Sequence, residues 1–177
     1  MKVVIENVYE KYVLDKATGK KLTTFYAYGV SQGACTIGHY CGRDPDRAAE
    51  ILDGALLYAA PWDIPNQTEF FYNRFYGLMQ LTVATLLSSK FLVQLEGMKK
   101  YLKNDEYESY KTTLKTNWDG LQTINEKIFV PMYGYKNLQE LSEYSSLVKL
   151  IEKIKVPIFA LTAKDDAFFN DEFVPKK

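Results

Sequence analysis

A serine bracketed by two glycines is the pattern in this sequence that points most directly to chemistry. Gly29, Ser31 and Gly33 form a G-x-S-x-G motif, which follows an aromatic and β-branched run and precedes small residues with helical spacing. Strand, G-x-S-x-G and helix is the layout of a nucleophile elbow, in which a sharp turn exposes the serine hydroxyl. We therefore predict that Ser31 is a nucleophile. The alternative is a glycine-bracketed turn without a catalytic role.

The same motif predicts a role for each neighbour of Ser31. A side chain at Gly29 or Gly33 would collide with the adjacent strand or helix, so glycine is expected at both positions. The backbone N–H of Gln32 stands at the start of the following helix. It is expected to point toward the place where an oxyanion would form.

A catalytic serine also needs an acid and a base. Asp165 and Asp166 follow a predicted strand, and either could hold the Nδ1–H of an imidazole; the alternative is a solvated turn with two acids. The one histidine is His39, eight residues after Ser31 on the same predicted helix. Eight helical residues rise about 12 Å, so His39 is expected to be structural. The 177 residues therefore do not encode a complete Ser-Asp-His triad.

Composition narrows the class of protein. The 22 basic and 22 acidic residues cancel, which gives no indication of binding to nucleic acid or to an anionic membrane surface. Cys35 and Cys41 have neither disulfide nor zinc spacing, so we expect small buried side chains in a reducing, intracellular compartment. The charged first 25 residues predict no signal peptide. The apolar stretch Leu78–Leu87 is too short to span a bilayer.

Hydrophobic spacing predicts an α/β protein. The second of three expected strands is apolar on successive residues, as in a parallel sheet covered on both faces. The expected strands are Leu22–Tyr28, Gly54–Ala60 and Val156–Leu161. The expected helices are Lys2–Leu14, Gln32–Cys41, a helical region 67–116 with a break at Ser88–Ser89, Leu121–Ile128, Leu138–Glu143, and a helix through Lys153 capped by Ser145 or Ser146; Arg47–Leu52 is expected to be a connection.

These elements suggest three regions. Residues 1–66 carry the predicted elbow, 67–116 form a helical insertion resembling a lid, and 117–177 return to the core with the acid-bearing strand. The aromatic face of the insertion is expected to be core rather than a ligand contact.

The order of these landmarks resembles the α/β-hydrolase fold, and within it the YheT-like, embryogenesis-associated branch. The likeness covers most of the chain but corresponds to the middle portion of a full hydrolase. It departs from the branch at Asn125, where an aspartate is usual, and at Ala167, which replaces a proline. The segments that carry it are Tyr28–Ala34, Ala59–Asp63, Pro131–Tyr135, Tyr144–Ser146, Lys155–Ile158 and Ala163–Phe168.

The resemblance implies a partial α/β-hydrolase sheet of about three parallel strands with flanking helices and a helical lid. It implies a carboxylic-ester or acyl-lipid substrate and no metal or organic cofactor. It favours Asp166 over Asp165 as the acid. The histidine and the second oxyanion donor would come from elsewhere, so we expect another chain, or further chain segments, to complete the sheet. The alternative is a catalytically silent, hydrolase-derived subunit of a larger assembly.

Overall fold

The computed structural model describes residues 1–116, 120–166, 168 and 170–175. The chain divides into two compact units. The sheet unit comprises Met1–Gln67 and Ser145–Lys177, and the helical unit comprises Thr68–Tyr144. Ala167, the predicted departure from the family turn, lies outside the described residues.

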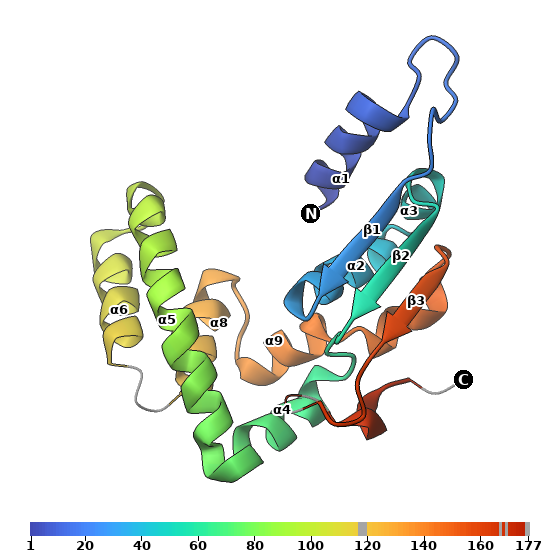
Figure 1. Ribbon diagram of the computed structural model, residues 1–177. Coiled ribbons are helices and arrows are strands. Elements are labelled where there is room, and N and C mark those ends of the chain that lie inside the picture. The colour runs from blue at the N-terminus through green and yellow to red at the C-terminus, as the bar shows by residue number, and fades with distance from the viewer. Residues whose placement is uncertain (117–119, 167, 169, 176–177) are drawn as a thin grey trace. The chain divides into compact units, whose positions relative to one another are not determined.

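A parallel sheet forms the centre of the sheet unit (Figure 1). Its strands in the described part of the chain are β1 (Tyr26–Val30), β2 (Gly54–Tyr58) and β3 (Ile158–Leu161), in the order β1-β2-β3. At the carboxyl edge Val30 pairs with Tyr58, and Tyr58 pairs with Leu161. The α/β class with parallel strands and flanking helices is therefore confirmed.

The predicted bounds of the first strand were wrong. The prediction placed it at Leu22–Tyr28, but the backbone N–H of Leu22 donates to the carbonyl of Val13 at 2.7 Å, and Leu14 pairs with Lys21 in an antiparallel bridge. Residues that close this loop are not available to the parallel sheet. The strand therefore begins at Tyr26 and runs to Val30, directly before the serine.

The helices of the sheet unit come from three parts of the sequence. They are α1 (Lys2–Val8), which continues as a π-helical turn over Tyr9–Val13, then α2 (Gln32–Arg43), α3 (Pro45–Ile51) and a 3-10 helix over Val148–Lys153.

The predicted connection at Arg47–Leu52 was wrong, because Pro45 occupies the first turn of α3, where its ring and missing N–H are tolerated. The predicted serine cap was also wrong, since Ser146 Oγ donates to the carbonyl of Trp62 at 3.0 Å.

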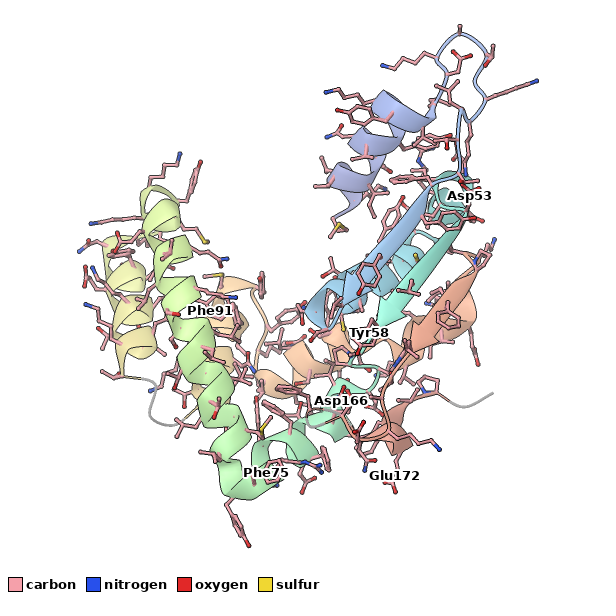
Figure 2. The ribbon with its side chains drawn as sticks, in the orientation of Figure 1. Asp53, Tyr58, Phe75, Phe91, Asp166 and Glu172 are labelled. Carbon is pink, nitrogen blue, oxygen red and sulfur yellow. The ribbon has the colours of Figure 1, made fainter. Side chains whose placement is uncertain are left out.

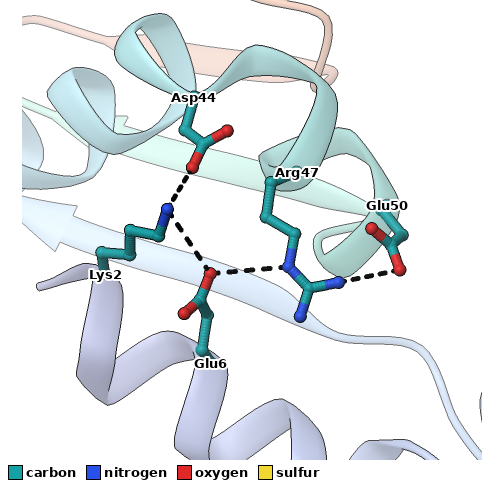
Figure 3. Close-up of polar contacts among 5 residues, drawn as sticks. All are labelled: Lys2, Glu6, Asp44, Arg47 and Glu50. Carbon is teal, nitrogen blue, oxygen red and sulfur yellow. Dashed lines mark hydrogen bonds and ion pairs between the residues drawn. The ribbon is translucent and has the colours of Figure 1, made fainter.

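Ion pairs fasten α1 to α2 and α3 (Figure 3). Lys2 Nζ lies 2.5 Å from a carboxylate oxygen of Asp44, and Glu6 Oε1 lies 3.5 Å from Arg47 Nε. Arg47 also pairs with Glu50 at 2.8 Å. Exposed pairs of this kind contribute little to stability, because water and salt screen them. The attachment of α1 therefore depends mainly on buried apolar side chains, among them Ile5, Tyr9 and Val13.

The two faces of the sheet differ in burial. Ala55 and Leu57 of β2 are buried with Ala34, Cys35 and Ile37 of α2 in one core cluster. Alternate residues point to the other face, and there large apolar side chains are exposed. The exposed residues are Tyr26, Tyr28, Val30, Tyr58, Phe159 and Leu161. A broad apolar face of the sheet is therefore exposed, and the expectation that β2 is covered on both faces is wrong for this chain.

The helical unit packs around a long helix. The elements in sequence order are α4 (Ile64–Asn73), a 3-10 turn (Arg74–Gly77), α5 (Leu78–Met98), a 3-10 turn (Lys99–Tyr101), α6 (Asn104–Lys115), α7 (Leu121–Ile124), a π-helical turn (Asn125–Phe129), α8 (Val130–Met132) and α9 (Leu138–Ser145). Tyr107, Leu114 and Ile124 are buried against α5. Phe91 and Phe129 meet edge to face at 5.2 Å.

The predicted break at Ser88–Ser89 does not exist. Ser88 is buried on the same side of α5 as Ala84, where small side chains let neighbouring helices approach. Ser89 Oγ donates to the carbonyl of Leu86 at 3.0 Å, so its hydroxyl is satisfied within the helix.

The continuity of α5 through Ser88 bears on the expectation about membranes, although the helical run that contains α5 bends at Phe75 and Tyr76. The helical stretch Ile64–Tyr101 has 38 residues, and by length and composition it could cross a membrane. The expectation drawn from Leu78–Leu87 stays a prediction. Length and composition do not decide the matter, because core helices of proteins without membranes pass the same test.

Candidate functional site

Ser31 occupies a strained turn between β1 and α2. Its backbone angles are φ 52° and ψ −117°, a combination that L-residues other than glycine rarely adopt. Its backbone N–H donates to the carbonyl of Tyr58 at 2.8 Å, and its own carbonyl accepts from the N–H of Cys35 at 3.1 Å. These two bonds hold the residue between the end of the sheet and the first turn of the helix, while Ser31 itself is exposed.

The two motif glycines differ in what the turn requires of them. A Cβ on Gly29 would lie 2.6 Å from the carbonyl carbon of Gly33 and 2.7 Å from the amide nitrogen of Ala34. Only a residue without a side chain fits there. A Cβ on Gly33 would meet no described atom within 4 Å. The expected collision is therefore confirmed at Gly29 and wrong at Gly33.

Gln32 begins α2, directly after the serine. The first N–H groups of a helix have no acceptor within it, and the helix dipole makes this end partly positive. A backbone donor in this position can stabilise negative charge that develops beside Ser31. The oxyanion role of the Gln32 N–H stays a prediction.

The predicted acids leave the same edge of the sheet as Ser31. Strands β1 and β3 both end there with β2 between them, so their ends are roughly 10 Å apart, which is two strand spacings. Figure 2 shows Asp53 at the start of β2, and Tyr58 and Asp166 toward its other end. Asp166 is half-buried and Asp165 is exposed. Asp166 Oδ1 accepts from the N–H of Phe168 at 2.8 Å, which orients one carboxylate oxygen.

His39 makes its hydrogen bonds with residues other than Ser31. Its Nε2 lies 2.8 Å from the carbonyl of Ser145, and its Nδ1 accepts from Arg43 Nε at 3.2 Å. Burial lowers the pKa of His39, and the positive charge of Arg43 lowers it further. The hydrogen bond to the Ser145 carbonyl raises this pKa but does not outweigh burial. Both ring nitrogens are thus committed to structure. The strands that precede Ser31 and the two acids end at one edge of the sheet, and His39 of α2 is bonded elsewhere.

Ala59 is a feature of this edge that the sequence did not reveal. It follows β2 with φ 49°, and its N–H donates to the carbonyl of Leu161 at 2.8 Å. A second strained residue therefore stands beside Ser31. Alanine ordinarily avoids this conformation, so no sequence signal could have identified it.

The other reactive groups of the sheet unit are not suited to nucleophilic work. Cys35 and Cys41 are buried and free, as expected. Burial raises the pKa of Cys35 to about 12 and that of Cys41 to about 11, so both thiols stay protonated at neutral pH. Within the described ranges, His, Cys, Asp and Glu side chains form no group of three that could hold a metal ion.

The fold and the turn define a class of protein. It is an α/β protein with a parallel sheet, in which a serine with strained backbone angles joins a strand to a helix in the geometry of a nucleophile elbow.

Comparison with known proteins adds distant relatives. The chain is distantly homologous to a monoacylglycerol lipase of Saccharomyces cerevisiae, with 27% identity over 152 residues, which is 80% of this chain and 31% of the lipase. Protein abhd-3.2 of Caenorhabditis elegans is 22% identical over 150 residues, which is 83% of this chain and 37% of that protein. The chain thus spans about a third of the length of these relatives. No family model and no solved structure matches it.

Proposed function

We propose that this chain carries the nucleophile and the acid of a serine hydrolase of the α/β-hydrolase type, in its YheT-like branch, acting on carboxylic esters or acyl lipids. The observation that carries the proposal is the strained backbone of Ser31 between a parallel strand and a helix, with a glycine two residues earlier where no side chain fits. The distant relation to a protein named monoacylglycerol lipase supports the substrate class.

The chemistry would follow the usual division of labour in such enzymes. The Oγ of Ser31 attacks the ester carbonyl carbon, and its proton passes to a histidine base. The Gln32 N–H stabilises the negative oxygen of the tetrahedral intermediate. The alcohol leaves with a proton from the histidine, and water then hydrolyses the acyl-serine. Asp166, with Asp165 as the alternative, holds the imidazole and stabilises its charged form.

The histidine in this scheme comes from outside the 177 residues, because His39 is bonded to Ser145 and Arg43. The same source would complete the sheet. The exposed apolar face and the outer edges of β1 and β3 are surfaces that a further chain, or further segments of one polypeptide, would cover. The two buried thiols support an intracellular, reducing compartment.

A catalytically silent structural subunit is the second candidate. The commitment of the one histidine to structural bonds favours it. In that case the strained turn would be inherited geometry, and the exposed face would serve assembly alone.

Labelling with a fluorophosphonate probe separates the two candidates. The native material is labelled, with Ser31→Ala as the test variant and Ser89→Ala as the matched control, since Ser89 is an exposed serine of the helical unit. The hydrolase proposal expects labelling that Ser31→Ala abolishes and Ser89→Ala preserves. Equal labelling of both variants, or none in an assembly shown to be intact, would leave the structural subunit as the function.

A further inference from the structure

Helix α5 presents an apolar surface that the core of the helical unit does not use. One side of the helix, with Ala84, Ser88 and Leu95, is buried. Leu78, Leu86 and Val93 lie on the exposed side, with exposed fractions of 61%, 64% and 75%. From Leu78 to Leu95 the sole charged residue is Lys90. We call Leu78, Leu86 and Val93 the outer stripe of α5.

The turn before α5 adds two aromatic side chains in strained positions. Phe75 and Tyr76 have φ of 51° and 56°, which is unfavourable for aromatic residues. Their side chains are nevertheless exposed, Phe75 by 58% and Tyr76 completely. Figure 2 shows Phe75 at the corner between α4 and α5. The strained backbone places both aromatic rings in solvent, where they add nothing to the core of the helical unit. We infer that the rings contact a partner, which would explain why the strain is kept.

Cationic residues outnumber acids in this part of the chain. Between residues 70 and 101 the charged residues are Arg74, Lys90, Lys99 and Lys100 against the single acid Glu96. Arg74 lies over the Phe70 and Phe75 rings at 4.6 and 5.2 Å, and Lys100 lies over the ring of Tyr101 at 4.7 Å. The balanced charge of the whole chain conceals this local excess.

We propose that the outer stripe of α5, with Phe75 and Tyr76, docks onto an anionic lipid surface. Apolar side chains between aromatic residues and lysines are what a helix in the bilayer interface presents, with the rings at headgroup depth and the cations near phosphates. The proposal concerns the helical unit alone, so it goes beyond the proposed esterase function and does not depend on it.

The helix lies on the membrane rather than across it. Its buried side packs on α6, which begins with Asn104, Asp105 and Glu106. Tyr107 of α6 donates to Glu96 at 2.5 Å, and Lys111 pairs with the same carboxylate at 3.5 Å. A spanning α5 would carry these charged groups into hydrocarbon, which is costly. With α5 in the plane of the interface, α6 and its charged groups stay on the water side, and the Glu96 carboxylate is paired with Lys111.

Sedimentation with vesicles tests the proposal on the full chain. The probe is vesicles of phosphatidylcholine containing phosphatidylserine, compared with phosphatidylcholine alone. We expect stronger binding to the anionic vesicles and a weakening by high salt. The double variant Leu86→Lys with Val93→Lys should reduce the partition coefficient by about tenfold or more, because two apolar side chains no longer enter the interface. Tyr12→Lys, an exposed tyrosine of the sheet unit, should have no such effect.

A second measurement covers the case in which the charged variants fold poorly. In a chain with Trp62 and Trp118 replaced by phenylalanine, the fluorescence of Leu86→Trp should be quenched by vesicles with brominated acyl chains, whereas that of Tyr12→Trp should not. Absence of vesicle binding, equal binding by all variants, or quenching of both tryptophans would overturn the proposal. Self-association of the chain that Leu86→Lys abolishes, without vesicle binding, would instead make this face a protein contact and would equally overturn it.

Discussion

At the scale of single residues, the turn at Ser31 depends on how little space the backbone leaves. Val30 ends β1 and Gln32 begins α2, so one residue reverses the path of the chain. That reversal places Gly29 against the backbone of Gly33 and Ala34. The positive φ of Ser31 is the cost of the turn, and the bonds to Tyr58 and Cys35 stabilise it.

Alanine substitutions of the two motif glycines should therefore have unequal effects. Gly29→Ala places a Cβ against rigid backbone, and we expect it to lower the free energy of unfolding by about 2–3 kcal/mol. Gly33→Ala enters open space in a helix, and we expect no loss and a gain of up to about 1 kcal/mol. Denaturant unfolding of both variants measures the difference. Similar losses at both positions would contradict the turn geometry described here.

The ionisation of His39 provides a second test at this scale. Because burial lowers the folded-state pKa of His39 below 6.5, the unfolded chain binds more protons just below that pH. The free energy of unfolding should therefore rise with pH through this window and level off above pH 6.5. His39 is the one histidine, so its imidazole NMR signal titrates without overlap. A midpoint at or above 6.5, or an unchanged pH dependence in His39→Gln, would refute the assignment.

At the scale of elements, a single carboxylate fixes where β1 begins. Asp53, just before β2, accepts from the backbone N–H of Phe25 at 2.7 Å and from Lys21 Nζ at 3.0 Å. These two hydrogen bonds hold the residues before β1 next to the start of β2. The N–H of Asp53 also donates to the carbonyl of Phe25 at 2.8 Å, which closes the junction from both sides.

This junction should weaken in acid. The bond from Phe25 and then the one from Lys21 lower the pKa of Asp53 below 3.8. Its stabilising contribution is thus complete above the unfolded-state pKa of about 3.9 and is lost as pH falls through the folded-state value. We expect Asp53→Asn to reduce stability at pH 7 and to flatten the acid dependence, whereas Asp165→Asn, in an exposed turn, should do neither. Urea unfolding at several pH values measures both quantities.

At the scale of the whole molecule, the two units leave different surfaces for partners. The sheet unit exposes apolar side chains of β1, β2 and β3 on one face, which suits further protein as a cover. The helical unit exposes the outer stripe of α5 and the Phe75–Tyr76 turn, which suits lipid. The labelling experiment tests the first unit and the vesicle experiment tests the second, so the two proposals can fail separately.

The sequence predicted those features that depend on local pattern. Three parallel strands, the helix after Ser31 and the burial of both cysteines could be predicted, because apolar periodicity and glycine spacing reflect backbone geometry over a few residues. The start of β1 and the continuity of α5 through Ser88 could not be predicted in this way. They depend on Val13 pairing with Leu22 and on small residues packing between helices.

The motif in the sequence thus determined that a serine stands between a strand and a helix, and that the one histidine follows it on the same helix. The tertiary structure alone decided that Ser31 and Ala59 are both strained at one edge, and that His39 binds Ser145. Residues 106 positions apart, such as His39 and Ser145, meet only when the sheet and its helices pack. No local sequence pattern encodes a contact between residues so far apart in the chain.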